Sequence, residues 1–130
     1  MIKVEDLRRS FGAQPVLRGI DLEVASGEII VIIGRSGGGK SVLLKHLVGL
    51  LRPDSGRIFV DGTEITRLRR SALDRIRERY GVVFQGGALF DSMSVAENVA
   101  FPLWEKVRIP ATDVRQRVEE KLVQVGLQGM

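Results

Sequence analysis

The 130-residue sequence predicts an α/β fold, in which a buried strand leads into a helix and an antiparallel β region precedes both. Residues 29–33 form a continuous β-branched run, which is typical of a strand covered on both faces, and 80–84 form a second apolar run of this kind. Residues 2–7 and 17–24 alternate apolar and polar side chains, as half-buried strands do. We therefore expect a core sheet that carries an N-terminal antiparallel β subdomain.

Local sequence signals predict the turns and the helix between residues 11 and 65. The segment FGAQP at 11–15 indicates a turn between the two alternating strands. Asp61-Gly62 lies inside the segment 57–65 and is a strong signal for a β-hairpin. A helix follows the glycine-rich stretch after residue 33, and RPDSG at 52–56 is expected to end it. The apolar residues at helical spacing in that helix are Val42, Leu43, Leu47 and Leu50.

The chain has 20 basic and 16 acidic residues, a net charge of +4, and much of the excess lies in the segment 67–80. A helix is predicted at 69–79. Its arginines are spread around the helix rather than along one stripe, and no aromatic side chains interleave with them to stack bases. We interpret the segment as a solvated helix face and do not expect nucleic acid as a partner. These arginines are Arg69, Arg70, Arg75, Arg77 and Arg79.

Residues 94–130 predict two helices. Ser94 and Glu97 have the spacing of a capping box, which marks the start of the first helix. Pro102 is expected to end or kink that helix. A second, amphipathic helix spans about 112–125, with Gly126 as its C-terminal stop. Its apolar side consists of Val114, Val118, Leu122 and Val125.

Composition excludes several classes of site. The absence of cysteine excludes disulfides and thiolate metal sites, and it agrees with a cytoplasmic location. No apolar run approaches the roughly 20 residues that span a bilayer, and the charged, alternating N-terminus is not a signal peptide. The single histidine, His46, is interpreted as structural or solvated. Phe101 and Trp104 are expected to pack among the C-terminal helices.

The stretch GRSGGGKS, which follows the run at 29–33, fits the phosphate-binding pattern G-x-x-x-x-G-K-[ST]. Glycines let the backbone curl so that successive N–H groups point inward, and the following helix adds its positive N-terminal end. Lys40 would reach the β- and γ-phosphates, and the Ser41 hydroxyl would bind Mg²⁺. The core sheet is therefore expected to be that of a P-loop NTPase. The predicted nucleotide-binding residues are Gly34, Arg35, Ser36, Gly37, Gly38, Gly39, Lys40 and Ser41.

The sequence around this loop indicates which family of P-loop NTPases the chain resembles. Residues 1–28 carry the alternating β pattern ahead of the loop, whereas P-loop kinases and GTPases usually begin almost at the P-loop strand. From Val16 to Ile65 the sequence follows, without a gap, the pattern of the nucleotide-binding subunits of ABC transporters, which it resembles over its whole length. The resemblance implies ATP as the nucleotide, Mg²⁺ as its metal and a second ATPase subunit as a partner.

Two further positions match that family. Phe11 stands where the family has an aromatic that stacks on adenine, and a flat apolar face suits a purine. The alternative is an aromatic that covers a turn. Gln85 follows the apolar run at 80–84, as the family's Q-loop glutamine does, and there it contacts Mg²⁺ and the attacking water. The resemblance thus implies catalytic roles for Lys40 and Gln85 and metal contacts for Ser41 and Gln85.

The stretches FQGGALF at 84–90 and VAFPL at 99–103 resemble, in particular, the ATPase subunits of Mla-type phospholipid transporters, formerly grouped with toluene-tolerance systems. This resemblance implies transport of phospholipid, driven by ATP hydrolysis, by a subunit that lies peripherally on the cytoplasmic face of the bacterial inner membrane. In the family, the region after the Q-loop contacts the permease. The alternative is a surface loop with one buried Leu-Phe pair. The expected permease contacts are Leu89, Phe90 and Met93.

The sequence also departs from the family. No LSGGQ signature, no apolar strand ending in Asp-Glu and no switch histidine follow Gln85, so the chain is expected to be a truncated, N-terminal part of an ABC ATPase. Three interpretations follow: a transport ATPase completed by further sequence, an inert nucleotide-binding fragment, or a soluble ABC ATPase outside transport. The expected organisation is a β subdomain with the P-loop strand (mainly 1–33 and 57–66), the P-loop and its helix (34–51), the Q-loop strand and loop (80–90) and the start of the helical subdomain (94–130).

Overall fold

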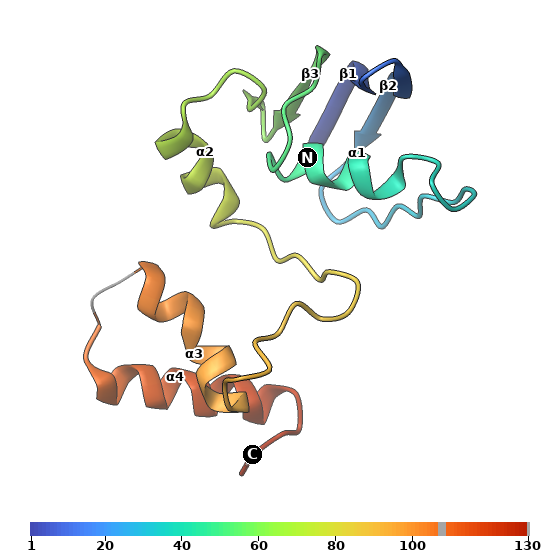
Figure 1. Cartoon of the computed structure of the whole chain (residues 1–130). Helices are drawn as coiled ribbons and strands as arrows, with labels where there is room; N and C mark the ends of the chain where they lie inside the picture. The colour runs from blue at the N-terminus through green and yellow to red at the C-terminus, as the bar shows by residue number, and fades with distance from the viewer. Residues whose placement is uncertain (107–108, 130) are drawn as a thin grey trace. The chain divides into compact units, whose positions relative to one another are not determined.

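The computed structural model describes residues 1–106 and 109–129, and the chain forms two compact units, Met1–Gly81 and Val82–Met130 (Figure 1). Each unit has a hydrophobic core of its own. The first unit contains all four strands and two helices, and the second contains two helices.

The sheet of the first unit is antiparallel throughout. Its strands are β1 (Ile2–Phe11), β2 (Gln14–Val24), β3 (Ser55–Val60) and β4 (Thr63–Glu64), and their spatial order is β2-β1-β3-β4. The β1–β2 hairpin confirms the two alternating strands and the turn between them, although both strands are longer than the alternation indicated. The predicted antiparallel β subdomain is therefore present.

A hairpin turn and a bulge in the sheet depend on left-handed backbone. Asp61 and Gly62 join β3 to β4 with φ angles of 47° and 80°, which are the positive values that a two-residue type I′ hairpin needs. β1 contains a bulge at Asp6, whose φ is 43°. The bulge shifts the alternation along β1, so that Val4 and Leu7 both lie in the core.

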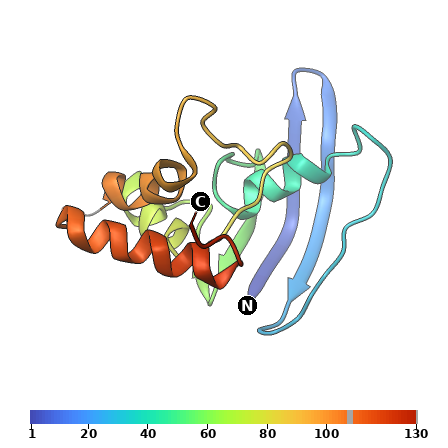
Figure 2. The ribbon, with the colours of Figure 1, turned by 90° about the horizontal axis from the view of Figure 1, so that it is seen from below.

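Helix α1 (Lys40–Leu47) lies against one face of the β1–β2 hairpin (Figure 2). Two of its predicted apolar residues, Leu43 and Leu47, are buried in the same cluster as Leu7 and Leu17 of the hairpin. His46 is completely buried, in agreement with a structural rather than a solvated residue. Burial of this helix face fixes the start of α1 relative to the sheet.

Helix α1 ends earlier than predicted. It stops at Leu47 rather than at RPDSG, because Gly49 adopts a φ of 70° and makes the two hydrogen bonds of a Schellman motif. In that motif the N–H of Gly49 donates to the carbonyl of His46, and the N–H of Leu50 donates to the carbonyl of Lys45. Leu50 consequently lies outside the helix and is exposed.

Helix α2 (Arg70–Arg77) confirms the helix predicted at 69–79. Its buried residue, Leu73, lies in the core beside Gly49. Arg77 donates to the carbonyls of Val48 and Gly49 and so caps the C-terminus of α1. The remaining arginines at 69, 70, 75 and 79 are exposed, which agrees with a solvated face.

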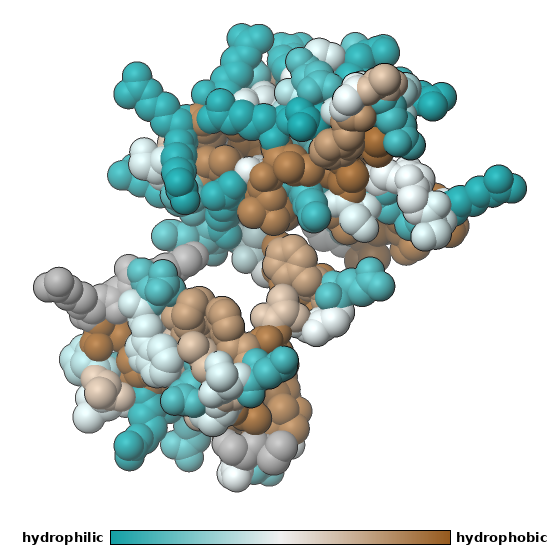
Figure 3. Space-filling model, in the orientation of Figure 1, coloured by the Kyte–Doolittle hydropathy of each residue, from teal (hydrophilic) through white to brown (hydrophobic). Residues whose placement is uncertain are grey.

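The strands predicted at 29–33 and 80–84 do not form among the described residues. Ile29, Ile33 and Val83 are 89%, 90% and 94% exposed. A buried parallel strand needs ladder partners at its edges and cover on its faces, and the one sheet in the described part of the chain ends at β2 and β4 without including either segment. Apolar side chains therefore reach the surface (brown in Figure 3).

The second unit is a pair of packed helices, α3 (Val95–Lys106) and α4 (Ala111–Gln124). Helix α4 confirms the predicted amphipathic helix, and Gly126, with a φ of 73°, follows its end as expected. Of the two predicted effects of Pro102, the end of the helix is wrong, because α3 continues through it to Lys106, and the kink stays a prediction. The core of this unit consists of Ala100, Val114, Val118 and Leu122.

Two aromatic predictions in this unit have different outcomes. Phe101 packs against Phe90, with ring centroids 4.7 Å apart, as expected of a residue that stabilises the helical region. Trp104 is 52% exposed, so the prediction that it packs there is wrong. Leu103 and Val99 on the same helix contact the core instead, because they lie on the side of α3 that faces α4.

The predicted capping box at the start of α3 is present. The carboxylate of Glu97 accepts hydrogen bonds from the Ser94 N–H at 2.7 Å and from the Ser94 hydroxyl at 2.8 Å. These bonds hold the pKa of Glu97 below its usual value, and the bond from the backbone N–H has the larger effect. A depressed carboxyl pKa in the folded state stabilises α3 above the unfolded pKa of Glu97, and this contribution is lost as the pH falls through the lower, folded pKa.

Replacing Ser94 with alanine should raise the pKa of Glu97 only part of the way to its usual value, because the backbone N–H remains a donor. An NMR titration of the Glu97 carboxyl carbon measures this rise. The matched control is Ser71→Ala, on an exposed part of α2 in the other unit. A Ser94→Ala titration identical to that of the unmodified chain would contradict the capping role.

Candidate functional site

The glycine-rich loop at 34–39 is exposed apart from Gly39 and curls in front of α1. Gly37 and Gly39 have φ angles of 76° and 87°, which favour glycine strongly over other residues. At Gly38 a side chain would lie 3.0 Å from the carbonyl oxygen of Arg35, the oxygen that accepts a hydrogen bond from the Gly38 N–H. The backbone shape of this loop therefore depends on the three consecutive glycines.

Lys40 folds back over the loop. Its Nζ donates to the carbonyl oxygens of Gly34 and Arg35, each at 2.7 Å. An ammonium has three donors, so two are used within the loop and one remains for a further acceptor. The ammonium of Lys40, the lysine of the stretch 34–41, therefore lies against the backbone of the loop.

The start of α1 offers backbone donors. The N-cap is Gly39, which provides no side-chain cap, and no acidic residue lies in the first turn. The N–H of Leu43 is the first to bond within the helix, to the carbonyl of Gly39 at 2.8 Å. The N–H groups of the preceding turn have no partner inside the helix, and they carry the positive end of the helix dipole. Together with Lys40 they can bind an anion such as a phosphate.

The Ser41 hydroxyl is exposed at the first turn of α1. A hydroxyl oxygen at this position suits Mg²⁺, which prefers oxygen ligands and is usually held by few protein groups together with phosphate oxygens. Among the residues that the structure describes, no group of three or more His, Asp or Glu side chains could hold a metal ion. A metal at this site would therefore depend on Ser41 and on the ligand's own phosphates.

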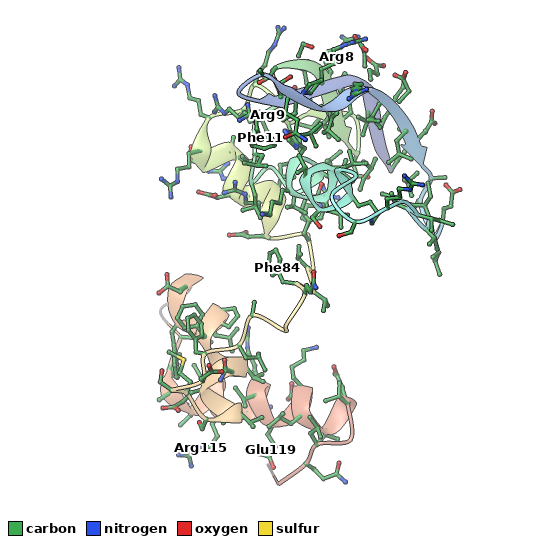
Figure 4. All side chains as sticks on the ribbon, turned by 45° about the vertical axis from the view of Figure 1, so that its right-hand side comes forward. Arg8, Arg9, Phe11, Phe84, Arg115 and Glu119 are labelled. Carbon is green, nitrogen blue, oxygen red and sulfur yellow. The ribbon has the colours of Figure 1, made fainter. Side chains whose placement is uncertain are left out.

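Phe11 ends β1, beside the two-residue turn of the hairpin, and is 45% exposed. The hairpin approaches the start of α1, since a side chain at Gly39 would lie 3.1 Å from the Val16 side chain and 3.3 Å from Leu17. Phe11 and the loop therefore belong to one unit, with Phe11 at the end of the hairpin that α1 covers. The guanidinium of Arg9 lies over the Phe11 ring (Figure 4).

Gln85 belongs to the second unit, whereas Lys40 and Ser41 belong to the first. It is exposed at the start of a turn at 85–88, in which the N–H of Gly87 donates to the carbonyl of Phe84 at 3.0 Å. Its predicted contacts with Mg²⁺ and water stay predictions.

The loop after this turn is fixed to α3 by one side chain, Asn98. The Oδ1 of Asn98 accepts from the N–H of Phe90 at 2.8 Å, and its Nδ2 donates to the carbonyls of Phe90, Met93 and Ser94, each at 3.1 Å. Leu89 and Phe90 are nevertheless 70% and 45% exposed. The loop presents apolar side chains on a backbone that Asn98 holds by hydrogen bonds, instead of burying a Leu-Phe pair.

Sequence reasoning missed two residues that shape these features, Asn98 and Arg9. An asparagine that holds a loop through several hydrogen bonds has no short-range sequence pattern, so nothing in the sequence around Asn98 indicated this role. Arg9 stands two positions before Phe11, and this spacing puts both side chains on one face of a strand. That spacing could have indicated the pair.

The chain is similar to proteins of a known family over most of its length. A family profile described as "ABC transporter" matches residues 17–130. The probable ribonucleotide transport ATP-binding protein mkl of Mycobacterium leprae is 46% identical over 128 residues, which are 98% of this chain and 37% of that protein. The methionine import ATP-binding protein MetN of Mesorhizobium japonicum is 46% identical over 127 residues, 98% of this chain and 34% of that protein. The chain thus spans about a third of the length of these curated relatives.

Solved structures agree. A dimeric ATP-binding cassette in a post-hydrolysis state, bound to ADP and Pi, matches with a TM-score of 0.85 and 29% identity over 99% of this chain and 59% of that one. A part of an ABC transporter complex from Clostridium perfringens matches with a TM-score of 0.80 and 35% identity, over 97% of this chain and 50% of that one. These matches confirm the predicted α/β fold class. No described helix is long and apolar enough to cross a membrane.

Proposed function

This chain belongs to the ABC transporter family, and we propose that it binds MgATP at the loop 34–41 as part of a transporter's ATP-binding subunit. The observation that carries the proposal is the position of Lys40. Its ammonium is anchored to two loop carbonyls beside the open N-terminus of α1, so a cation and backbone donors converge on one exposed place.

The residues present fit the proposed ligand. Gly37 and Gly39 adopt the positive φ angles on which the curled loop depends, and the first turn of α1 contributes N–H donors without any acid. The third donor of Lys40 would contact a terminal phosphate oxygen, and Ser41 would be the protein ligand of Mg²⁺. The metal would neutralise charge on the β- and γ-phosphates. Phe11 would supply the apolar face for adenine.

Hydrolysis and transport are parts of the same proposal. Gln85 would contact Mg²⁺ and the attacking water, with the permease bound by Leu89, Phe90 and Met93 and a second ATPase subunit completing the assembly. Support for the permease contact comes from the exposed apolar side chains of the loop to which Asn98 is hydrogen-bonded. The subunit would lie on the cytoplasmic face of the bacterial inner membrane.

The proposed cargo is phospholipid, and its support is the two sequence stretches at 84–90 and 99–103. The relatives' names point instead to ribonucleotides and methionine. ATPase stimulation of the complete transporter in vesicles, with each of the three cargoes in turn, separates these candidates. Stimulation by methionine or a ribonucleotide but not by phospholipid would contradict the lipid proposal.

Calorimetric titration with MgATP, magnesium triphosphate and magnesium sulfate tests the nucleotide site. We expect saturable binding of the first two ligands, with MgATP bound more tightly, and no comparable binding of sulfate. Competition between ATP and triphosphate is expected, because both would use the same loop. Absence of MgATP binding by a chain that is folded by circular dichroism would contradict the proposal.

Replacing Phe11 with alanine should weaken the binding of ATP but not that of free triphosphate, because only ATP has a base that can stack on the ring. Base–aromatic stacking is worth about 1–3 kcal/mol per base, so we expect at least about a fivefold loss in ATP affinity. The matched control is Phe59→Ala, which removes a half-buried phenylalanine from β3 of the same sheet. Equal losses for both ligands would mean that Phe11 only supports the hairpin turn.

A further inference from the structure

Arg9 and Phe11 form a stacked pair at the end of the hairpin. The guanidinium carbon of Arg9 lies 4.9 Å from the centroid of the Phe11 ring, within the range of a cation–π interaction. The two residues are two positions apart on β1, so both side chains project from the same face of the strand. Figure 4 shows them together at this end of the sheet. Arg9 thus covers one face of the ring, while Phe11 as a whole stays 45% exposed.

Arg9 is itself held in place. Its Nη1 donates to the Oδ1 of Asp54 at 2.8 Å and to the carbonyl of Arg52 at 3.3 Å. The other carboxylate oxygen of Asp54 accepts from the N–H of Ser10 at 2.7 Å, and the Asp54 N–H donates to the carbonyl of Arg8 at 2.9 Å. Four hydrogen bonds therefore tie the segment at 52–54 to the end of β1 and leave Arg9 little freedom.

The pair lies on the face of the sheet that α1 covers. Leu7, Arg9 and Phe11 alternate along β1, and Leu7 is buried in the cluster that includes the α1 leucines. The start of α1 adjoins this hairpin, because Gly39 lies against Val16 of β2. Phe11 therefore continues the α1-facing surface beyond the buried core, toward the end of the sheet where the phosphate loop meets it.

We propose that Arg9, anchored by Asp54, is a positioning residue for the adenine of ATP: it covers one face of Phe11 and leaves the opposite face for the base. The inference rests on the proposed function, since it requires ATP at the loop. An aromatic side chain that is already immobile loses less entropy when the base stacks on it. Ordering a free side chain at an interface costs about 0.5–1.5 kcal/mol, which corresponds to roughly a two- to tenfold change in affinity.

The same sheet contains an internal comparison. Arg57 lies over the ring of Phe59 at 5.4 Å, and it pairs with Glu5 at 2.6 Å. These two residues alternate with Ile58 and Val60, which are buried, so this second pair lies on the opposite face of the sheet from the core. The second pair therefore combines the same two residue types as the first but lies on the other face of the sheet.

The experiment measures the dissociation constants of MgATP and magnesium triphosphate for the full chain and four variants. Arg9→Ala should weaken MgATP roughly two- to tenfold and leave triphosphate unchanged. Asp54→Asn, which keeps an acceptor for the Ser10 N–H, should give a smaller loss in the same direction. Arg9→Lys should restore part of the affinity, because it keeps a cation over the ring. Arg57→Ala should leave the dissociation constants of both ligands unchanged.

A double variant, Arg9→Ala with Phe11→Ala, should bind MgATP no more weakly than Phe11→Ala alone, because the two residues act through one contact. Should Arg9→Ala fail to fold by circular dichroism, Asp54→Asn decides the question.

Two results would overturn the inference while leaving ATP binding intact. One is an equal loss for ATP and triphosphate in Arg9→Ala, which marks a merely structural role. The other is an unchanged ATP affinity in both Arg9→Ala and Asp54→Asn while Phe11→Ala still reduces it. Absence of MgATP binding by the unmodified chain would instead remove the proposed function, and the inference with it.

Discussion

Replacing Lys40 with alanine should reduce the affinity for MgATP at least about tenfold, because each charge-assisted hydrogen bond is typically worth about 1.5–3 kcal/mol. Lys40 is the lysine of the phosphate loop 34–41, and its Nζ is already directed over the loop by two carbonyl oxygens. Its loss therefore removes both a phosphate contact and the bonds that hold the loop closed. The measurement is a calorimetric titration of both proteins with MgATP at the same ionic strength.

The matched control is Lys45→Ala. Lys45 is an exposed lysine in the last turn of the same helix, so its removal changes the net charge equally without altering the loop. A third variant, Lys40→Gln, keeps hydrogen-bond donors but no charge, and it should still lose most of the affinity if the cation is the main contribution. Equal MgATP affinity in Lys40→Ala and the unmodified chain would refute the assignment of the site to this loop.

The parts of the fold that the sequence predicted correctly depend on interactions between near neighbours. The hairpin at Asp61-Gly62 needs only two residues with positive φ, and the capping box needs only Ser94 and Glu97 three positions apart. Gly126 at the end of α4 is a similar case. Each of these signals is read and satisfied within a few residues, so no knowledge of the tertiary structure was required.

The run at 29–33 shows why other predictions failed. Its composition is that of a strand, but a strand is defined by the neighbours that share its hydrogen bonds, and these lie elsewhere in a sequence. The described sheet supplies none, and Ile29 and Ile33 stay exposed. The helix end at Gly49 was missed for a different reason. A Cβ at Gly49 would lie 2.7 Å from the side chain of Leu73, more than 20 residues away, so part of the need for glycine here comes from a distant residue.

In the candidate site, too, some features could be predicted from local sequence and others depend on residues far apart in the chain. The motif at 34–41 was sufficient to predict a curled glycine backbone in front of a helix, because motif and helix start are contiguous. The role of Lys40 toward phosphate stays a prediction. The support around the site was not predictable from local pattern. Asp54 reaches β1 from the segment after α1, and Asn98 clamps a loop eight residues before it. Such contacts exist only once the chain is folded.

Replacing Gly56 with alanine should be among the most destabilising single substitutions in the first unit. Gly56 has a φ of 92°, and an added Cβ would press against the carbonyl oxygen of Asp6 and lie 2.7 Å from the carbonyl oxygen of Glu5. These are backbone atoms at the bulge of β1, so they cannot move aside as the end of a side chain can. Strained backbone and overpacking together cost about 2–6 kcal/mol.

A comparison with Gly62→Ala separates these two causes. Gly62 also has a positive φ, 80°, but a Cβ there would meet nothing within 4 Å, so its substitution should cost only about 1–2 kcal/mol from backbone strain. Urea unfolding of the two variants measures the difference. Because β3 pairs with β1 on either side of the bulge, the larger loss at Gly56 should also displace the end of β1 that carries Arg9 and Phe11. Equal unfolding free energies for the two variants would show that β1 and β3 are not packed as closely as Gly56 requires.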